Sequence, residues 1–501
     1  MVYNYEKPTK GGPHRCGLRV GIFPRPFEPD AAHTAVGIVA PDTRIIRTIL
    51  MMIFLPIQKG ESGFPAGVRA SHEDASMSLF SQNPALTQVF AQHGKALAQA
   101  ESLCPDVIRA AIEAGTMVLL GNPSHPDLAP VLVGQPAKVK INANIGTSPM
   151  RSTHEEELDK LAVALAAGAD TIMDLSIAGD LAVIRKAMLD ACPRPIGTVP
   201  LYAVAQRYIN AGKDPASFSP EEIFEEIAKQ AEQGVDFMTV HCGITERAAT
   251  WASEEDGRTM GIVSRGGSIL ARWMRTHKKE NPLLTEYERI LTIARKHNVT
   301  LSLGDGLRPG AGSDAGDPAQ WDEVIMLGRL AQQGIKAGVQ CMIEGPGHVR
   351  LHEVESQIRG IKSAGKGVPL YVLGPLTIDS GPGYDHIAGA IGGAIAVRAG
   401  VDFLCYLTPA EHLTLPDKED VHAGVMASRI AAQAGEVALG RPQAIARENA
   451  MSLARKNLDW KGMQMAALDP AIVCAKRAEH AQEDVCAMCG EFCAVKMLRK
   501  S

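Results

Sequence analysis

The fold of this chain is decided by the stretch Val339-Gln340-Cys341-Met342-Ile343-Glu344-Gly345-Pro346-Gly347-His348. The run up to Ile343 is short and apolar, as is typical of a buried strand, and it ends in the carboxylate of Glu344. A stiff Gly-Pro-Gly turn follows and leads to the imidazole of His348. Parallel strands present their carboxyl ends at one edge of a sheet, so this pattern predicts a strand that delivers reactive side chains to such an edge.

Seven further apolar runs extend this pattern in both directions along the chain. With the first, they cover residues 139–146, 171–176, 196–202, 236–241, 300–304, 339–345, 370–375 and 402–408. Amphipathic helical patterns lie between them, for example at 155–167, 220–233, 321–333 and 419–434, and Gly168, Gly234, Gly334 and Gly400 mark expected helix ends. Eight strand–helix alternations predict an α/β fold, a (β/α)8 TIM-type barrel. A doubly wound open sheet is the competitor, but no early GxGxxG motif supports it.

Polar residues fall where the runs end, which favours the barrel. These residues are Asn144, His241, Asp305, Glu344 and Tyr406. The C-terminal rim of such a barrel is its active face, so we expect these side chains to meet there.

Four regions are expected along the chain. Residues 1–76 show no clear periodicity and are rich in Pro and Gly, so we expect a poorly ordered extension or a start assigned too early, with Met77 as the alternative first residue. A helical lead-in with a short strand at 117–120 covers 77–137, the catalytic barrel covers 138–439, and a helix-prone segment with a cysteine motif covers 440–501.

Composition narrows the function classes. Apolar residues make up 46% of the chain, charged residues 21%, and the net charge is −5, so a nucleic-acid partner is not expected. The apolar stretch at 49–55 is far shorter than a membrane span, so no membrane partner is expected either. Seven scattered cysteines without disulfide-like spacing indicate a reducing cytoplasm.

The other three cysteines crowd together near the C-terminus. Cys486, Cys489 and Cys493 lie within eight positions, which indicates a metal or redox site. Three thiolates would hold a four-iron cluster with one iron open, the arrangement that S-adenosylmethionine requires. A zinc knuckle closed by a distant His or Cys is the alternative.

Two glycine-rich stretches suggest phosphate recognition. Ser264-Arg265-Gly266-Gly267 offers a hydroxyl, a guanidinium and accessible N–H groups, the parts of a phosphate cradle. The stretch 304–310 repeats the idea, with Asp305 beside Arg308. Each stretch alone is a weak signal.

A pair of histidines suggests a metal at the rim. His348 follows one predicted strand and His412 follows the last, so both imidazoles would lie on the same rim and hold a divalent metal with open positions. The loop 381–386 brings Tyr384, Asp385 and His386 together, either in the site or as a turn that caps the next helix through Asp385.

The motifs together resemble one enzyme family. They occur in the order NANIG (142–146), TIMDLS (171–176), GTVP (197–200), GIVSRGG (261–267), SLGDGLRP (302–309), EGPGH (344–348) and PGYDH (382–386), followed by the cysteines. As an ordered set, spanning about 108–496, they closely resemble the phosphomethylpyrimidine synthase family of thiamine biosynthesis.

The resemblance implies a radical S-adenosylmethionine lyase with a barrel domain, a C-terminal [4Fe–4S] cluster on Cys486, Cys489 and Cys493, and zinc or another divalent metal on His348 and His412. It implies 5-aminoimidazole ribotide as substrate, with Glu344 and His241 as acid–base groups. The implied substrate contacts are Asn144, Met173, Tyr202, His241, Ser264, Arg265, Gly266, Asp305, Gly306, Leu307, Arg308, Glu344 and Tyr371.

Departures from the family pattern surround the expected active face. They are the spacing between Cys489 and Cys493, the loop at 379–386, Thr414 after Glu411-His412, Arg350, and the lack of the family's large N-terminal domain. Such changes beside an intact substrate set predict a paralogue with another product, 5-hydroxybenzimidazole synthase of anaerobic cobalamin biosynthesis. The alternatives are the pyrimidine synthase itself and a zinc-dependent barrel hydrolase with a structural cysteine tail.

The same resemblance implies the partners. An electron donor such as flavodoxin or ferredoxin would reduce the cluster, and the enzyme would be a homodimer. Whether the cysteine tail serves its own barrel or that of a second copy stays open at this point.

Overall fold

The computed structural model describes residues 78–150, 153–254 and 257–497. The expected extension at 1–76 and the alternative start at Met77 lie outside these residues. Among the described helices, none is both long and apolar enough to cross a bilayer.

Eight parallel strands close into a barrel, as predicted. In barrel order they follow the chain from β3 to β9, and β10 closes the ring between β9 and β3. Their bounds are β3 (Lys140–Ile145), β4 (Thr171–Asp174), β5 (Ile196–Thr198), β6 (Phe237–Val240), β7 (Thr300–Leu303), β8 (Cys341–Glu344), β9 (Leu370–Leu373) and β10 (Phe403–Cys405).

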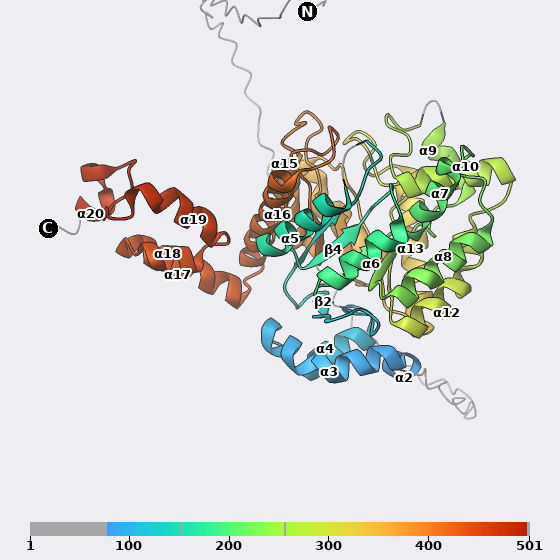
Figure 1. Ribbon diagram of the computed structural model, residues 1–501, viewed down its shortest axis with the longest axis horizontal. Coiled ribbons are helices and arrows are strands. Elements are labelled where there is room, and N and C mark those ends of the chain that lie inside the picture. The colour runs from blue at the N-terminus through green and yellow to red at the C-terminus, as the bar shows by residue number, and fades with distance from the viewer. Residues whose placement is uncertain (1–77, 151–152, 255–256, 498–501) are drawn as a thin grey trace, which may run out of the picture. The chain divides into compact units, whose positions relative to one another are not determined.

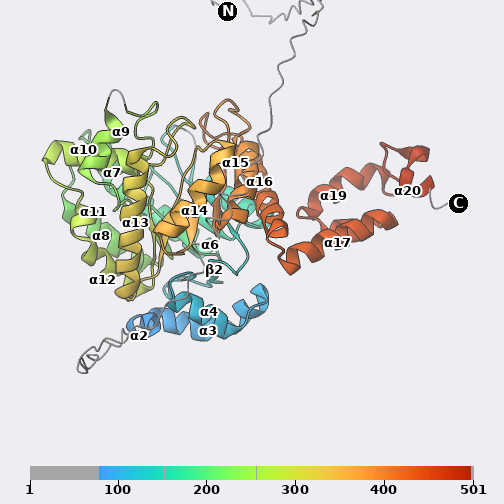
Figure 2. The same cartoon turned by 180° about the vertical axis from the view of Figure 1, so that it is seen from behind.

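Helices form an outer ring around these strands (Figures 1 and 2). The ring consists of α5 (His154–Ala167), α6 (Leu181–Ala191), α8 (Pro220–Gln233), α12 (Tyr287–His297), α13 (Pro318–Lys336), α14 (Val354–Ala364), α15 (Asp385–Ala399) and α16 (Lys418–Ala438). Four more helices lie in the segments after β5 and β6: α7 (Pro200–Asn210), α9 (Glu246–Ser253), α10 (Arg265–His277) and α11 (Pro282–Thr285). The fold is therefore a (β/α)8 barrel with elaborated connections on its C-terminal side.

Helix ends follow the glycines with one exception. Gly168 and Gly234 end α5 and α8 in the left-handed conformation, with φ of 95° and 109°. Gly334 does not end its helix, because α13 continues to Lys336. A Cβ at Gly334 would lie 2.4 Å from the Cys341 sulfur, so this glycine serves close packing of helix on strand.

Aromatic rings fill the inside of the barrel. Phe237 and Phe403 meet edge to face at 6.2 Å between ring centroids, and Tyr371 stacks on Phe403 at 4.3 Å. The Phe237 ring occupies the space where a side chain at position 197 would stand, 2.2 Å from an ideal Cβ on Gly197. These rings form a solid floor beneath the C-terminal rim.

The segment before the barrel is only partly helical. It contains α2 (Leu79–Gln82), α3 (Pro84–Glu101) and α4 (Pro105–Glu113), and also an antiparallel pair, β1 (Val118–Leu120) and β2 (Val131–Val133). The sequence indicated the first strand but not the second. Leu86, Ile108 and Leu119 are among the residues of a separate small core here.

The C-terminal segment continues as α17 (Pro442–Asn457), α18 (Trp460–Ala466), α19 (Pro470–Arg477) and α20 (Ala494–Met497). It carries the three clustered cysteines between α19 and α20. Its helical character agrees with the expectation from sequence.

Candidate active site at the barrel rim

Three adjoining hollows form a chamber on the C-terminal side of the barrel. The deepest is about 90 Å³, and its neighbours are about 270 and 660 Å³. Asn144 borders the first and second hollows, Arg308 the first and third, and Arg265 the second and third. Together they reach the size of a small-molecule site.

Most predicted substrate contacts line the deepest hollow. They are Asn144, Met173, Tyr202, His241, Asp305, Arg308, Glu344 and Tyr371. Arg265 lines the two neighbouring hollows. Ser264, Gly266, Gly306 and Leu307 do not line these hollows but lie behind the lining, where their contacts shape it.

Glu344 stands at the end of β8 with one oxygen already held. Its Oε1 accepts hydrogen bonds from Ser302 Oγ at 2.8 Å, on the adjacent strand β7, and from Thr239 Oγ1 at 2.7 Å, on β6 beyond it. These two hydroxyls fix the carboxylate and leave Oε2 for a ligand.

His241 lies buried just past β6 and is packed against a glycine. Its Nε2 is 3.3 Å from Ser264 Oγ, and a Cβ at Gly266 would collide with the ring at 2.2 Å. Burial, with a smaller contribution from Arg308, lowers the pKa of His241 to about 3, so the imidazole is neutral near pH 7. Within the described residues its Nδ1 has no hydrogen-bond partner, which suits it to meet a ligand.

The predicted phosphate cradle lies at the start of helix α10. Ser264 caps α10, with its Oγ accepting from Gly267 N at 3.1 Å, and Arg265 is the first helical residue. The Arg265 guanidinium lies 4.8 Å from the centre of the Tyr202 ring. Free N–H groups at a helix start favour an anion, and the guanidinium adds charge at the same place.

The second predicted stretch presses against the first. A Cβ at Gly267 would lie 2.1 Å from the carbonyl oxygen of Gly306, so the two turns touch through glycines. Asp305 and Arg308 pair at 3.3 Å. Burial raises the pKa of Asp305 well above its ordinary value, against the opposing effect of Arg308, and Glu344 adds to the rise.

Two polar residues at the floor were not singled out from sequence. Asn142 Nδ2 donates to Asn144 Oδ1 at 2.7 Å and to Tyr371 Oη at 2.8 Å, which fixes both lining residues. Cys405 lines the hollow and accepts from Asn144 Nδ2 at 3.0 Å, although a lone cysteine in a strand reads as a buried hydrophobe. Burial raises the pKa of Cys405 to about 12, so it is a thiol there.

His348 and His412 come together beside the largest hollow. Their ring centroids are 5.3 Å apart. His348 Nδ1 lies 2.7 Å from Asp379 Oδ1, and His412 Nδ1 lies 3.4 Å from Asp385 Oδ1. The hydrogen bond to Asp379 holds the His348 tautomer whose Nε2 is free for a metal, and two adjacent imidazoles with carboxylates nearby are donors that fit a divalent cation.

The spacing of residues in the sequence does not predict that Asp379 lies beside His348 or that Asp385 lies beside His412. Asp385 starts α15 and lies beside His412, so its loop belongs to the site and is more than a turn before a helix. Glu411, which is partly buried, borders the same two hollows as Arg265. Burial raises its pKa, against the opposing effect of His412.

Tight turns bring the clustered cysteines into one short loop. Gly490 N donates to Cys486 O at 3.1 Å, and Cys493 N donates to Gly490 O at 3.2 Å. Arg477 stacks 3.8 Å from the centre of the Trp460 ring and donates to Val485 O at 3.2 Å, which fastens the loop just before Cys486. N–H groups of the loop, that of Cys489 first, lower the pKa of Cys486.

No group of three metal-binding side chains is already assembled within the described ranges. The donor chemistry nevertheless fits an iron–sulfur cluster. Cys486 and Cys489 are half-buried and reach each other, and thiolates are the ligands such clusters use.

Comparisons with known proteins agree with this geometry. The Radical SAM ThiC family model matches residues 82–500. The phosphomethylpyrimidine synthase of Desulfotalea psychrophila (strain LSv54 / DSM 12343) is 49% identical over 406 residues, which are 81% of this chain and 93% of the relative. Proteins of the same name from Syntrophus aciditrophicus (strain SB) and Thermodesulfovibrio yellowstonii (strain ATCC 51303 / DSM 11347 / YP87) are 46% and 47% identical, over 81% and 82% of this chain and 95% and 97% of the relatives.

Solved structures give a much fainter likeness. A dihydropteroate synthase from Coxiella burnetii, in complex with pteroic acid, aligns over 62% of this chain and 96% of its own, with 13% identity and a TM-score of 0.35. A score this low carries no argument. The sequence relationship is decisive by itself: the chain belongs to the Radical SAM ThiC family, whose members are lyases that use S-adenosylmethionine and an iron–sulfur cluster.

Proposed function

We propose that this enzyme is a phosphomethylpyrimidine synthase, which converts 5-aminoimidazole ribotide to the phosphorylated hydroxymethylpyrimidine of thiamine biosynthesis. The observation that carries the proposal is the convergence of eight predicted substrate contacts, Arg308 among them, on one hollow, with Arg265 in the lining of the two hollows that adjoin it. The choice of product rests on relatives at 46–49% identity, all of which bear this enzyme's name.

The expected branch to 5-hydroxybenzimidazole gains no support from these comparisons. One argument for it was the lack of a large N-terminal domain. The alignments cover 93–97% of the named pyrimidine synthases, so those relatives have little room for such a domain either. That departure therefore does not distinguish the two products, and the alternative is the better supported one.

The substrate phosphate would be bound between Arg265, the N–H groups at the start of α10 and Arg308. Charged hydrogen bonds and the positive end of the helix act in the same direction there. Asn144, fixed by Asn142, and Tyr371, stacked on Phe403, would contact the deep end of the substrate. The arrangement favours a phosphorylated molecule with a flat heterocycle.

We assign proton transfer to Glu344. One oxygen is anchored by two hydroxyls, and the second is available to accept or return a proton at the substrate. His241, predicted as a second acid–base group, is a neutral imidazole and would act as a hydrogen-bond partner.

Cys486, Cys489 and Cys493 would hold the [4Fe–4S] cluster. When bound, the cluster supplies the electron that cleaves S-adenosylmethionine, and the chain supplies orientation and exclusion of water. His348 and His412 would hold zinc or another divalent metal, with Asp379 fixing the His348 ring and Asp385 close to His412. An electron donor of the flavodoxin or ferredoxin class, a homodimeric state and a cytoplasmic location complete the proposal.

Anaerobic reconstitution of the full chain tests it. The protein is supplied with iron, sulfide, a reductant, S-adenosylmethionine and 5-aminoimidazole ribotide, and the products are separated and identified by mass. We expect 5′-deoxyadenosine and hydroxymethylpyrimidine phosphate, and neither with Cys489→Ala. Fluorescent hydroxybenzimidazole would overturn the product assignment in favour of the paralogue. A colourless zinc protein that makes no 5′-deoxyadenosine would overturn the whole proposal.

A further inference from the structure

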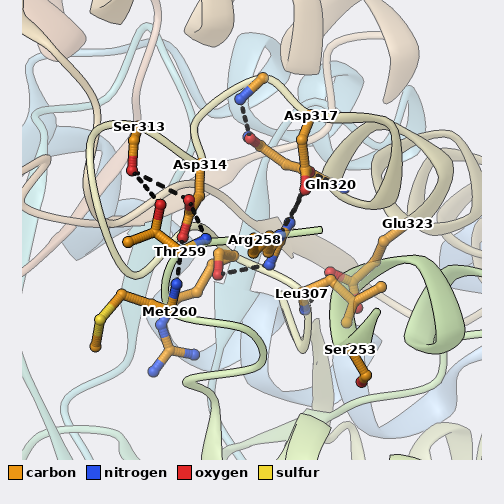
Figure 3. Close-up of polar contacts among 12 residues, drawn as sticks. Ser253, Arg258, Thr259, Met260, Leu307, Ser313, Asp314, Asp317, Gln320 and Glu323 are labelled. Carbon is orange, nitrogen blue, oxygen red and sulfur yellow. Dashed lines mark hydrogen bonds and ion pairs between the residues drawn. The ribbon is translucent and has the colours of Figure 1, made fainter. Parts of the chain in front are cut away.

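A buried arginine outside the chamber bonds to the turn that carries Arg308 and lies on the segment that leads to Arg265. The Arg258 side chain is 1% exposed and forms a two-point contact with Asp317, Nε to Oδ2 at 2.6 Å and Nη2 to Oδ1 at 2.8 Å. Its third nitrogen, Nη1, donates to the carbonyl oxygen of Arg308 at 3.2 Å. Figure 3 shows Arg258 at the centre of this network, with Asp317 beside it. Arg258 borders none of the three hollows described above.

The partner carboxylate is itself fixed. Asp317 caps α13, and its Oδ1 accepts from Gln320 N at 2.8 Å. The next turn of the helix carries Glu323, whose Oε2 accepts from Leu307 N at 2.7 Å. Helix α13 therefore holds the Asp305–Arg308 turn from two sides, through Arg258 and through Glu323.

The residues after Arg258 are fastened to the same loop. Thr259 N and Met260 N donate to the two oxygens of Asp314 at 2.8 and 3.0 Å, and Thr259 Oγ1 lies 3.0 Å from Ser313 Oγ (Figure 3). Although burial alone would raise it, the pKa of Asp314 is lowered by these N–H donors. The chain then runs from Met260 to Ser264 and Arg265. The segment that leads into the Arg265 turn is therefore bonded to the loop that follows the Arg308 turn.

These bonds can hold Arg265 and Arg308 near each other despite their like charges. Arg265 and Arg308 border the same hollow, where like charges repel unless an anion lies between them. A planar guanidinium with a bidentate carboxylate and a third bond has one geometry, so it fixes both turns more firmly than an ammonium group would. Site residues keep their geometry only when a surrounding layer holds them.

We propose that Arg258 is a positioning residue that sets the spacing of Arg265 and Arg308, so that both act on one phosphate group of the substrate. The proposal rests on the function proposed above, because it takes the two turns as the phosphate site. It goes further in assigning selectivity for a phosphorylated over an unphosphorylated ligand to a residue that does not border the site.

The test compares two ligands in the reconstituted holoenzyme without S-adenosylmethionine. Under that condition, binding of 5-aminoimidazole ribotide and of its riboside, which lacks the phosphate, is measured by calorimetry. KM and kcat for the ribotide are measured separately, with S-adenosylmethionine and a reductant supplied. We expect Arg258→Gln to weaken ribotide binding and raise KM by about 10- to 100-fold, the range for a lost charged contact, with little change for the riboside. Arg258→Lys should fall in between, since it keeps charge without the fork.

The matched control is Arg247→Gln. Arg247 also pairs with a carboxylate of α13, Asp322, but it is 66% exposed and the bond lies away from both turns. We expect it to bind both ligands as the unchanged enzyme does. If Arg258→Gln does not fold, Arg258→Lys, which keeps a positive charge beside Asp317, is measured in its place.

The outcomes separate the two proposals. If the enzyme without substitutions binds neither ligand, the proposed function is overturned. An unchanged enzyme that prefers the ribotide, with variants that keep the preference or lose both ligands equally, would overturn the positioning role alone.

Discussion

Both ends of the barrel bury polar side chains, but the two ends differ in how many of these side chains have hydrogen-bond partners. At the N-terminal end, Asp236 accepts from Asn122 N at 2.8 Å, Ile196 N at 2.7 Å and His125 at 2.7 Å, so the chain satisfies it completely. At the C-terminal end, buried atoms of His241, Glu323, Asp385 and Thr408 have no partner within the described residues. Thr300, at the start of β7, is an exception at the first end.

Further residues at the N-terminal end repeat the pattern. Asp402 accepts from Gln135 N, Leu370 N and Lys362 Nζ at 2.7–2.8 Å, and Gln340 bonds both to the Leu119 backbone and to Asn298. Buried polar groups that are fully paired hold segments together, whereas unpaired ones are kept where a ligand will meet them. The comparison predicts that changes at one end affect stability and changes at the other affect activity.

The largest expected effect is at the rim. Glu344→Gln removes a group that accepts or returns a proton but keeps an oxygen for Thr239 and Ser302, so kcat should fall by about 10²- to 10⁴-fold. The free energy of unfolding in urea should change by less than about 1 kcal/mol. A variant with normal kcat would show that Glu344 takes no part in catalysis. It would also contradict the expectation that changes at the C-terminal end of the barrel affect activity.

The next effect is at the opposite end. Asp236→Asn leaves His125 buried without its charged partner, so unfolding should cost about 3–5 kcal/mol less, with KM unchanged. Asp190→Asn is the control: its pair with Lys186 is about half exposed, and we expect a change within about 0.5 kcal/mol. A large change in KM with intact stability would show that the two ends are coupled.

A smaller effect is expected for the phosphate cradle. Arg265→Gln should weaken ribotide binding by about 1.5–3 kcal/mol, the value of a charged hydrogen bond, with melting temperature nearly unchanged. Arg272→Gln, on the same helix and paired with Asp214 at 2.7 Å on the surface, should leave binding unaffected. Equal losses in both variants would point to α10 as a whole rather than to its first residue.

The smallest effect concerns pH. Burial alone would lower the pKa of His125, but the hydrogen bond and charge of Asp236 outweigh it and raise the pKa above the ordinary value. Stability from the charged pair is therefore fully present below pH 6.5 and is lost as pH rises through the raised pKa. Urea unfolding from pH 5 to 9 should show this loss in the unchanged protein and not in His125→Gln. Parallel curves would mean that His125 stays neutral.

Much of the fold was predictable because the strand ends are marked locally. Five of the eight apolar runs carry a polar residue such as Glu344 at or just past their C-terminal end, and this pattern needs no long-range information. The helix end expected at Gly334 was wrong, because in sequence a glycine that ends a helix cannot be told from one that allows close packing, here against Cys341.

The less predictable part of the site depends on side chains brought together from afar. Arg258 meets Asp317 across 59 positions, and Asp379 reaches His348 across 31, so no short motif contains either pair. Glu323 lies on a helix whose sequence pattern predicts an amphipathic helix but not the bond of Glu323 to Leu307. These residues come together only once β6, β7, β8 and β9 lie side by side in the barrel.

The aromatic floor of the barrel has a kinetic consequence. Phe237, Phe403 and Tyr371 pack against one another inside the barrel, beneath the hollow that Tyr371 lines. We therefore expect a substrate that contacts Tyr371 to enter and leave on the C-terminal side, past the neighbouring hollows. A second molecule bound in those hollows should then slow the release of the first.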